Sequence, residues 1–480
     1  MRFTEKFRAL AEIPHRAGVL RKRMRSNYQA EIPRRLFGTS GVRGVVHKDL
    51  TTDMLYDLGQ AIATSLPPLS WIIIANDTRK SRAEVKTAVE MGLIASGARV
   101  LDVGTLPTPA LAYMTRNMGV DAGIMVTASH NPPEYNGIKL FSGDGIGYSR
   151  EQEKSVEQIY FQGNFRTETG SIQHAFELQR SYFDYLKKIP GINIFSRKFR
   201  VVVDPGNGAA SKFASELFSD LGLEVLPLND TPDGSFPGRN PEPREDTLVG
   251  TYEFLKKKQA DLAVCFDGDA DRVVFIDEQG FIGFDEAITF LASLAVKSSG
   301  KKRVATTVET GKLLDLGLQG MGVNVVRGTV GDVSVACLTR SIDAAIGVEP
   351  VGVYIMPEAG FYPNSFLAAL TLLGNVGSIA EVRRFFKGVP KLYSEQRKIP
   401  CSNEAKFAIM QKVIEHSTLL GSGMPNIIDG LRLETGDSWL LIRPSGTEPI
   451  IRISAESTFK AETRELLEKA TSVITGLMRE

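Results

Sequence analysis

Short apolar runs alternate with longer amphipathic stretches along the chain from residue 36 onward. This alternation predicts strands covered by helices, the pattern of α/β layers. Three successive blocks of similar length each contain three such runs, which indicates a threefold repeated α/β unit. The predicted strands lie at 71–75, 99–103, 122–126, 199–203, 223–228, 262–266, 303–308, 324–327 and 344–348.

The end of the chain follows another pattern. Apolar runs at 430–434, 438–442 and 450–455 predict an antiparallel meander, and an amphipathic helix is expected over 460–478. The fold class is therefore α/β, with three related α/β domains and a smaller C-terminal α+β domain. We expect a basic extension and four domains, with these bounds: 1–35, 36–165, 166–280, 281–395 and 396–480.

Charge is unevenly placed. Residues 1–35 carry ten Lys or Arg against three Glu, a local balance of +7, so the rest of the chain carries −6 and the whole +1. We interpret the extension as a solvated helix rather than an arm for RNA or membrane. A net charge near zero disfavours nucleic acid and anionic membranes as partners.

The cysteines and the hydropathy narrow the class of protein further. Three isolated cysteines (Cys265, Cys337 and Cys401) suit neither a zinc site nor a disulfide framework. No apolar run approaches the roughly 18 residues that a membrane span needs. We expect a cytoplasmic protein.

An acidic motif follows the strand predicted at 262–266, and it reads Asp267-Gly268-Asp269-Ala270-Asp271-Arg272. Three carboxylates at alternate positions can wrap a hard cation, and Mg²⁺ leaves room for a phosphate oxygen. A calcium loop of the EF-hand type is disfavoured, because Arg272 stands where such a loop needs glycine. A second interpretation stays open, in which Asp267 is the nucleophile of a phosphatase and Asp269 its acid partner.

A small polar loop follows the strand predicted at 122–126, and it reads Thr127-Ala128-Ser129-His130-Asn131-Pro132. Ser129 lacks the G-x-S-x-G context of an acyl-transfer serine. Beside a divalent cation it can instead carry a phosphoryl group, because that chemistry needs positioning and charge neutralisation most. Lys139 follows ten residues later and can reach the same loop.

A third motif is typical of a phosphate cradle, and it reads Arg443-Pro444-Ser445-Gly446-Thr447-Glu448-Pro449. It combines a guanidinium with two hydroxyls and a glycine, and it lacks the lysine of a nucleotide-triphosphate loop. Glu349 stands among apolar neighbours, and residues 36–44 form a glycine-rich turn that contains Arg43. Since ligands of α/β sheets bind beyond the carboxyl ends of strands, these clusters can converge on one cleft.

Four segments in this order and spacing, 36–44, 127–132, 267–272 and 443–449, resemble the α-D-phosphohexomutase superfamily. Its members include phosphoglucomutases, phosphomannomutases and phosphoglucosamine mutases, and the first segment is most similar to the archaeal-type phosphoglucosamine mutase branch. The resemblance implies four domains around a central cleft. It also implies an isomerase that moves a phosphoryl group between positions 1 and 6 of a hexose or hexosamine phosphate, with glucosamine phosphate favoured. A phosphoserine and a sugar 1,6-bisphosphate, which also acts as activator, would be the intermediates.

The same resemblance implies a role for each motif. Ser129 would be the phosphoserine, and Lys139 would transfer protons. Arg43 and Arg272 would flank the moving phosphoryl, and Glu349 would contact sugar hydroxyls. One Mg²⁺ would be held by oxygen ligands from Ser129, Asp267, Asp269 and Asp271. The phosphate that is not reacting would be held by Arg443, Ser445, Gly446 and Thr447.

One segment departs from the superfamily's pattern. The sugar-reading loop G-G-E-x-S-G-H corresponds to residues 347–353, where Val351 replaces the serine and Val353 the histidine. Lys139, Tyr354 or Glu358 would then supply the base. The change leaves open a phosphopentomutase, a phosphomannomutase or phosphoglucomutase, and a non-catalytic sugar-phosphate sensor.

Overall fold

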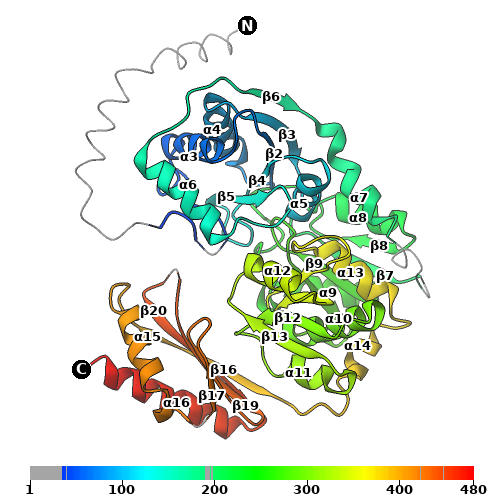
Figure 1. Cartoon of the computed structure of the whole chain (residues 1–480). Coiled ribbons are helices and arrows are strands. Elements are labelled where there is room, and N and C mark those ends of the chain that lie inside the picture. Colours follow the sequence, from blue (N-terminus) through cyan, green and yellow to red (C-terminus); the bar gives the residue numbers. More distant parts are fainter. Residues whose placement is uncertain are drawn as a thin grey trace.

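The structure is a computed structural model that describes residues 35–38, 40–189, 195, 198–421, 423–446 and 448–479. The extension predicted at 1–35 lies outside these residues except for Arg35. The described chain forms four sheets, which define domains I to IV in chain order (Figure 1).

Domain I contains a six-stranded sheet in the order β1-β5-β4-β2-β3-β6. The central strands are buried because their runs are continuously apolar, as in Ala122–Val126. The strands are β1 (Val42–Val45), β2 (Trp71–Asn76), β3 (Arg99–Thr105), β4 (Ala122–Val126), β5 (Tyr135–Ser142) and β6 (Ser171–His174). The helices are α3 (Thr52–Ser65), α4 (Arg82–Ala95), α5 (Thr108–Asn117) and α6 (Arg150–Gln162).

Domain II contains a five-stranded sheet in the order β11-β10-β9-β7-β8. The strands are β7 (Arg200–Asp204), β8 (Glu224–Pro227), β9 (Leu262–Phe266), β10 (Val273–Asp277) and β11 (Gly280–Phe281). The helices are α7 (Ser181–Leu186), which precedes the sheet, α8 (Phe213–Asp220) and α9 (Val249–Lys258).

Domain III contains a four-stranded sheet in the order β13-β12-β14-β15. The strands are β12 (Arg303–Thr307), β13 (Asn324–Gly328), β14 (Ile346–Glu349) and β15 (Val353–Ile355). The helices are α10 (Phe284–Ser299), α11 (Leu313–Leu318), α12 (Asp332–Ser341), α13 (Ser365–Gly374) and α14 (Ala380–Phe385).

Domain IV contains an antiparallel sheet in the order β16-β20-β19-β18-β17, and Figure 1 shows it in orange and red beside the green and yellow domain III. The strands are β16 (Tyr393–Pro400), β17 (Met424–Asn426), β18 (Leu431–Thr435), β19 (Ser438–Pro444) and β20 (Ile450–Ser457). The helices are α15 (Lys406–Glu415) and α16 (Lys460–Leu477).

Domains I to III share one apolar core, whereas domain IV has its own. Ile73, Phe266 and Phe366 belong to the same cluster of buried side chains, although each comes from a different domain. Val413 and Ile453 belong to a separate cluster inside domain IV. Burial of apolar area therefore binds the first three domains into one body. Within the described part of the chain, no helix has the length and apolar character needed to cross a membrane.

The α/β fold class is confirmed, and each of the nine strands predicted in the first three blocks coincides with an observed strand. The sequence pattern missed eight strands, namely β1, β5, β6, β10, β11, β15, β16 and β17. Three of them, β5, β10 and β15, run antiparallel to β4, β9 and β14. Each therefore returns the chain from a polar loop that follows a buried strand. The predicted limit at 165 separates β6 from domain I, although β6 pairs with β3 of that domain. The predicted limit at 395 lies inside β16 of domain IV.

Candidate active site

The loop between β4 and β5 holds Ser129 in an unusual backbone conformation, with φ of +51°. The Ser129 backbone N–H donates to Thr127 Oγ1 at 2.8 Å. Arg79 is fully buried, and its Nη2 donates to the carbonyl oxygens of Ser129 at 2.8 Å and of Asn131 at 2.6 Å. These donors satisfy carbonyls inside the loop, so the loop is rigid where the side chain of Ser129 emerges.

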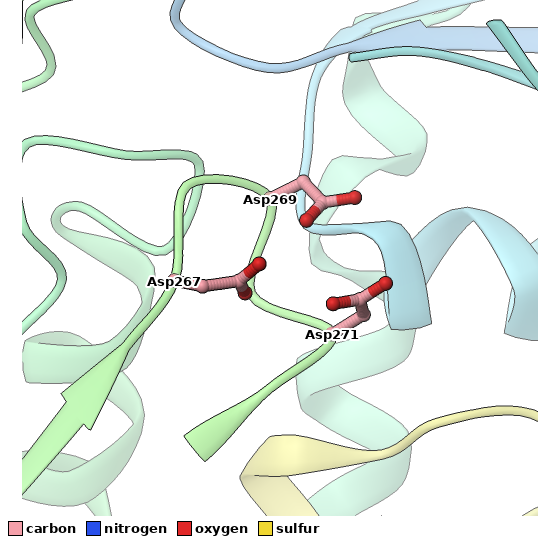
Figure 2. Close-up of side chains that lie close together, drawn as sticks. All are labelled: Asp267, Asp269 and Asp271. Carbon is pink, nitrogen blue, oxygen red and sulfur yellow. The ribbon is translucent and has the colours of Figure 1, made fainter. Parts of the chain in front are cut away.

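The hairpin loop between β9 and β10 carries Asp267, Asp269 and Asp271, whose side chains project into a shared space (Figure 2). One oxygen of each carboxylate lies within 4.8 Å of the others, and all three residues are buried. The Ser129 hydroxyl donates to Asp267 Oδ2 at 2.7 Å. The structure thus joins two loops that lie 138 residues apart in the sequence.

Two neighbours orient the carboxylate of Asp269. Lys139 on β5 donates from Nζ to Asp269 Oδ2 at 2.7 Å and to Asp271 Oδ2 at 2.5 Å. Thr108, the first residue of α5, donates from Oγ1 to Asp269 Oδ2 at 2.6 Å. Although burial opposes both shifts, the pKa of Asp269 is lowered by Lys139, and the pKa of Lys139 is raised by the two carboxylates. Burial, Asp271 and Asp269 together raise the pKa of Asp267.

The acidic loop fits a magnesium ion. Asp269 Oδ1 and Asp271 Oδ1 are buried and have no hydrogen-bond partner among the described residues. Lys139 donates to the Oδ2 atoms of Asp269 and Asp271, so the two Oδ1 atoms without a hydrogen-bond partner remain available to a further cation. The donors are hard oxygens on one short loop, which suits Mg²⁺ better than a soft metal.

Cationic and neutral side chains complete the surroundings of Ser129. Arg43 on β1 donates to Asn131 Oδ1 at 3.3 Å, and the Arg272 backbone N–H donates to Asp267 Oδ1 at 3.2 Å. The Nε atoms of both arginines are buried without a hydrogen-bond partner among the described residues, and Arg272 Nε lies 3.9 Å from Asp271 Oδ1. His130 Nδ1 lies 3.3 Å from Ser129 Oγ. Burial, with Arg272 and Arg43, lowers the pKa of His130 to about 2, so the ring is neutral.

Glu349 is the last residue of β14 and lies near Arg272. Its Oε1 accepts a hydrogen bond from the Gly331 backbone N–H at 2.9 Å. Burial and the charge of Asp332 raise the pKa of Glu349 to about 7, and the charge of Glu349 contributes to a raised pKa of Arg272.

The hairpin after Glu349 contains the position of the missing histidine, and three other residues were expected to supply the base in its place. Val353 pairs with Glu349 across the hairpin, and Val351 lies at its turn. Tyr354 is 1% exposed within the shared apolar core, so it does not replace the histidine. Glu358 is exposed. Of the three candidates, the structure places Lys139 at the acidic loop.

The predicted phosphate cradle connects β19 to β20 in domain IV. Arg443 pairs through Nη1 with Glu309 of domain III, and its Nη2 lies 3.4 Å from Asp429 Oδ2. Ser445 Oγ accepts from the Glu448 backbone N–H at 3.1 Å. Gly446 faces open space, since a methyl group there would meet no atom within 4 Å. Thr447 lies outside the described residues.

The structure therefore groups most of the predicted residues around one loop. The members are Arg43, Ser129, Lys139, Asp267, Asp269, Asp271 and Arg272, with Glu349 close to Arg272. Arg443 instead lies at the contact between domains III and IV. Sequence reasoning missed Arg79, Thr108, Glu309 and Asp332. Thr108 and Asp332 are the first residues of α5 and α12, whereas Glu309 comes just after β12, as Ser129 and Asp267 come just after β4 and β9.

The family comparison covers most of the chain. Models described as phosphoglucomutase/phosphomannomutase match residues 34–167 (domain I), 180–280 (domain II), 285–382 (domain III) and 398–472 (C-terminal domain). The chain belongs to the phosphoglucomutase/phosphomannomutase family. It is accordingly an enzyme of the phosphosugar mutase class, as the resemblance of its motifs implies.

Individual relatives agree over nearly the whole length. A probable phosphoglucosamine mutase from Pyrococcus abyssi is 37% identical over 91% of this chain and 97% of its own. A phosphoglucosamine mutase from Methanocaldococcus jannaschii is 35% identical over 92% of this chain and 98% of its own. A phosphoglucomutase/phosphomannomutase family protein from Burkholderia thailandensis has the same fold, with a TM-score of 0.80 and 24% identity over 93% of this chain and 98% of its own. The archaeal-type phosphoglucosamine mutase branch is the one that this chain resembles most.

Proposed function

We propose that this enzyme interconverts the 6-phosphate and the 1-phosphate of glucosamine, using Ser129 as the phosphoryl carrier. The observation that supports it most strongly is the 2.7 Å contact between the Ser129 hydroxyl and Asp267 Oδ2 inside a buried loop of three carboxylates. The names of the relatives favour glucosamine phosphate as the substrate. If the Ser129 loop were only a structural turn at the surface, its hydroxyl would not need a buried contact with Asp267.

In this proposal Asp267, Asp269 and Asp271 hold Mg²⁺ together with an oxygen on Ser129. When bound, the ion supplies neutralisation of charge on the moving phosphoryl group. Thr108 and Lys139 orient the carboxylates that face the ion, as their contacts with Asp269 indicate.

The reaction begins with a phosphoryl group on Ser129. A sugar hydroxyl attacks the phosphorus, the bond from phosphorus to Ser129 Oγ breaks, and a sugar bisphosphate forms. The bisphosphate turns around, and its other phosphoryl group returns to Ser129 Oγ. The proton that Ser129 then loses already lies in a hydrogen bond to Asp267 Oδ2. Lys139, an ammonium whose pKa the two carboxylates raise, is the proposed proton shuttle. It donates a proton to Ser129 Oγ as the bond to phosphorus breaks, and it takes up the proton that the attacking sugar hydroxyl loses.

The remaining residues bind the substrate. Arg43 and Arg272 have buried Nε atoms with no hydrogen-bond partner among the described residues, and we assign them to the reacting phosphoryl group. Glu349 is assigned to sugar hydroxyls. The second phosphate is assigned to four residues of domain IV, namely Arg443, Ser445, Gly446 and Thr447.

The decisive experiment maps the phosphoryl carrier. The full-length protein is incubated with labelled glucosamine 1,6-bisphosphate and Mg²⁺, then digested and analysed by mass spectrometry. We expect a phosphate ester on Ser129 that resists neutral hydroxylamine, and none in Ser129→Ala, with Ser299→Ala as the matched control. An acyl phosphate on Asp267 that hydroxylamine cleaves would overturn the proposal in favour of the phosphatase.

Turnover is measured with hexosamine, hexose and pentose 1-phosphates in the presence of catalytic bisphosphate. We expect Ser129→Ala to abolish turnover while sugar-phosphate binding persists. Binding without turnover of any substrate by the unaltered protein would instead identify a sensor.

A further inference from the structure

Arg443, the arginine proposed for the second phosphate, is already occupied by carboxylates. Its Nη1 pairs with Glu309 Oε1 and its Nη2 lies 3.4 Å from Asp429 Oδ2. Arg443 Nε is buried and has no hydrogen-bond partner among the described residues, so the guanidinium keeps donors that the carboxylates do not use. A phosphate bound at Arg443 nevertheless lies against both carboxylates, and the repulsion between like charges favours release of one of them.

Asp429 and Glu309 differ in how firmly they are held. Asp429 Oδ2 also accepts from the Val330 backbone N–H at 3.0 Å, which ties it to domain III. Glu309 follows β12, and its side chain is 33% exposed. Among the described residues, the Glu309 carboxylate contacts Arg443 alone, whereas Asp429 has a second contact, so Glu309 is the one that a phosphate displaces.

Glu309 lies at the same edge of the domain III sheet as Glu349. Glu309 follows β12 and Glu349 is the last residue of β14, and these two strands pair in parallel, so their carboxyl ends lie side by side. In the proposed function, a sugar that spans Arg443 and Ser129 lies along this edge.

Displacing Glu309 has a different consequence for different sugars. A phosphate on Arg443 leaves the Glu309 carboxylate unpaired beside an anion, which is unfavourable. A neutral hydroxyl or acetamide on the sugar does not compensate this charge. A protonated amine does, because it forms a charge-assisted hydrogen bond with the released carboxylate.

We propose that Glu309 is the residue that selects amino-sugar phosphates: it exchanges its contact with Arg443 for one with the ammonium group of the sugar when phosphate binds. The inference rests on the proposed function, since it assumes that Arg443 receives the second phosphate. It adds a residue of domain III that distinguishes a cationic sugar from neutral ones.

The test compares the dissociation constants of glucosamine 6-phosphate and glucose 6-phosphate for the dephosphorylated full-length protein, measured by isothermal titration calorimetry. We expect the natural protein to bind the amino sugar about tenfold more tightly, or better. In Glu309→Gln the two constants should become nearly equal, because glucosamine phosphate binds more weakly and glucose phosphate more tightly. N-acetylglucosamine 6-phosphate should behave as glucose 6-phosphate does.

Asp429→Asn is the matched control, because it removes the other carboxylate from the same guanidinium. We expect it to change both constants by a similar factor and to preserve their ratio. Thermal melts check that both variants fold, and Glu309→Asp is a second variant that should retain part of the selectivity.

Two results would overturn the proposal: equal affinities in the natural protein, or an unchanged ratio in Glu309→Gln. The turnover assay reports on the proposed function separately. If the natural protein shows no turnover but Glu309→Gln changes the ratio of the two dissociation constants, the mutase function is refuted and the selectivity of Glu309 stands. If the natural protein turns over glucosamine phosphate but Glu309→Gln leaves the ratio unchanged, the function stands and the selectivity is refuted.

Discussion

Ser129 combines backbone strain with several hydrogen bonds that keep it in place. A non-glycine residue at φ of +51° costs on the order of 1–3 kcal/mol unless its surroundings enforce it. Here Thr127 accepts from its backbone N–H, and buried Arg79 donates to its carbonyl oxygen. The strain is therefore offset locally, and the hydroxyl is directed at Asp267 rather than at solvent.

Thr108 provides a prediction at the scale of one atom. Thr108→Val removes the hydroxyl that donates to Asp269 Oδ2 at 2.6 Å and keeps the shape of the side chain. We expect the Mg²⁺ concentration for half-maximal turnover to rise roughly 10- to 100-fold, as is usual when a metal ligand loses its support. Thr115→Val, also on α5 but bonded to the Leu111 carbonyl, is the control and should leave this concentration unchanged. Equal magnesium curves for both variants would contradict the prediction.

Hairpins, rather than strand-to-helix turns, present the loops of the site. The Ser129 loop joins β4 to β5, the acidic loop joins β9 to β10, and the Glu349 loop joins β14 to β15. A hairpin anchors both ends of its loop in backbone ladders, so each loop is held at two points. The threefold repeat of the fold thus places one hairpin per domain at the site.

Gly268 is the point where two of these loops touch. A methyl group on Gly268 would lie 2.5 Å from the Ser129 carbonyl oxygen, so Gly268→Ala must push the loops apart. We expect a stability loss of about 1–3 kcal/mol and a fall in kcat of roughly 100-fold, because a displacement near 1 Å misaligns phosphoryl transfer. Chemical denaturation and steady-state kinetics measure the two effects.

The control for this change is Gly250→Ala in α9, where a methyl group meets nothing within 4 Å. It should preserve kcat. Normal kcat in Gly268→Ala would show that the contact between the loops is not needed.

Domain IV is attached to domain III through polar contacts and one small apolar cluster, formed by Val308 of domain III with Trp439 and Leu441 of domain IV. Lys312 Nζ pairs with Glu434 at 2.5 Å, and Arg432 Nη1 donates to the Val308 carbonyl at 2.6 Å while its guanidinium lies 4.1 Å from the Trp439 ring centre. Domains I to III are instead joined through a shared apolar core. Polar interfaces are exchanged with water at lower free-energy cost than apolar ones, so we expect domain IV to open and close on the other three. Full multiple-turnover activity in a protein crosslinked in the closed state would refute this motion.

Asp285 makes the stability of this interface depend on pH. Burial, and then the charge of Glu456 from domain IV, raise its pKa to about 7 from 3.8. Between these values the folded state holds a proton that the unfolded state has lost, so this group's contribution to stability falls as pH rises from about 4 to about 7. Asp285→Asn removes the charge, and we expect it to stabilise the protein at pH 8 by about 1–3 kcal/mol, with little effect near pH 4. Denaturation at both pH values, with exposed Asp437→Asn as control, tests this, and an equal gain at both would contradict it.

The sequence by itself determined where the buried strands lie and which loops carry chemistry. Both are local properties, since the burial of a strand such as Ala122–Val126 is visible in its own apolar run, and three carboxylates in six residues are already neighbours. Only the tertiary structure decided which loops meet. The apolar pattern reports burial and not partners, and it missed β5, β10 and β15 although these strands are buried.

Contacts that are remote in sequence were equally invisible. Thr108 reaches Asp269 across 161 residues, and Glu309 reaches Arg443 across 134. Such pairs form because packed sheets bring loop ends together, and neither residue carries a local signal of its partner.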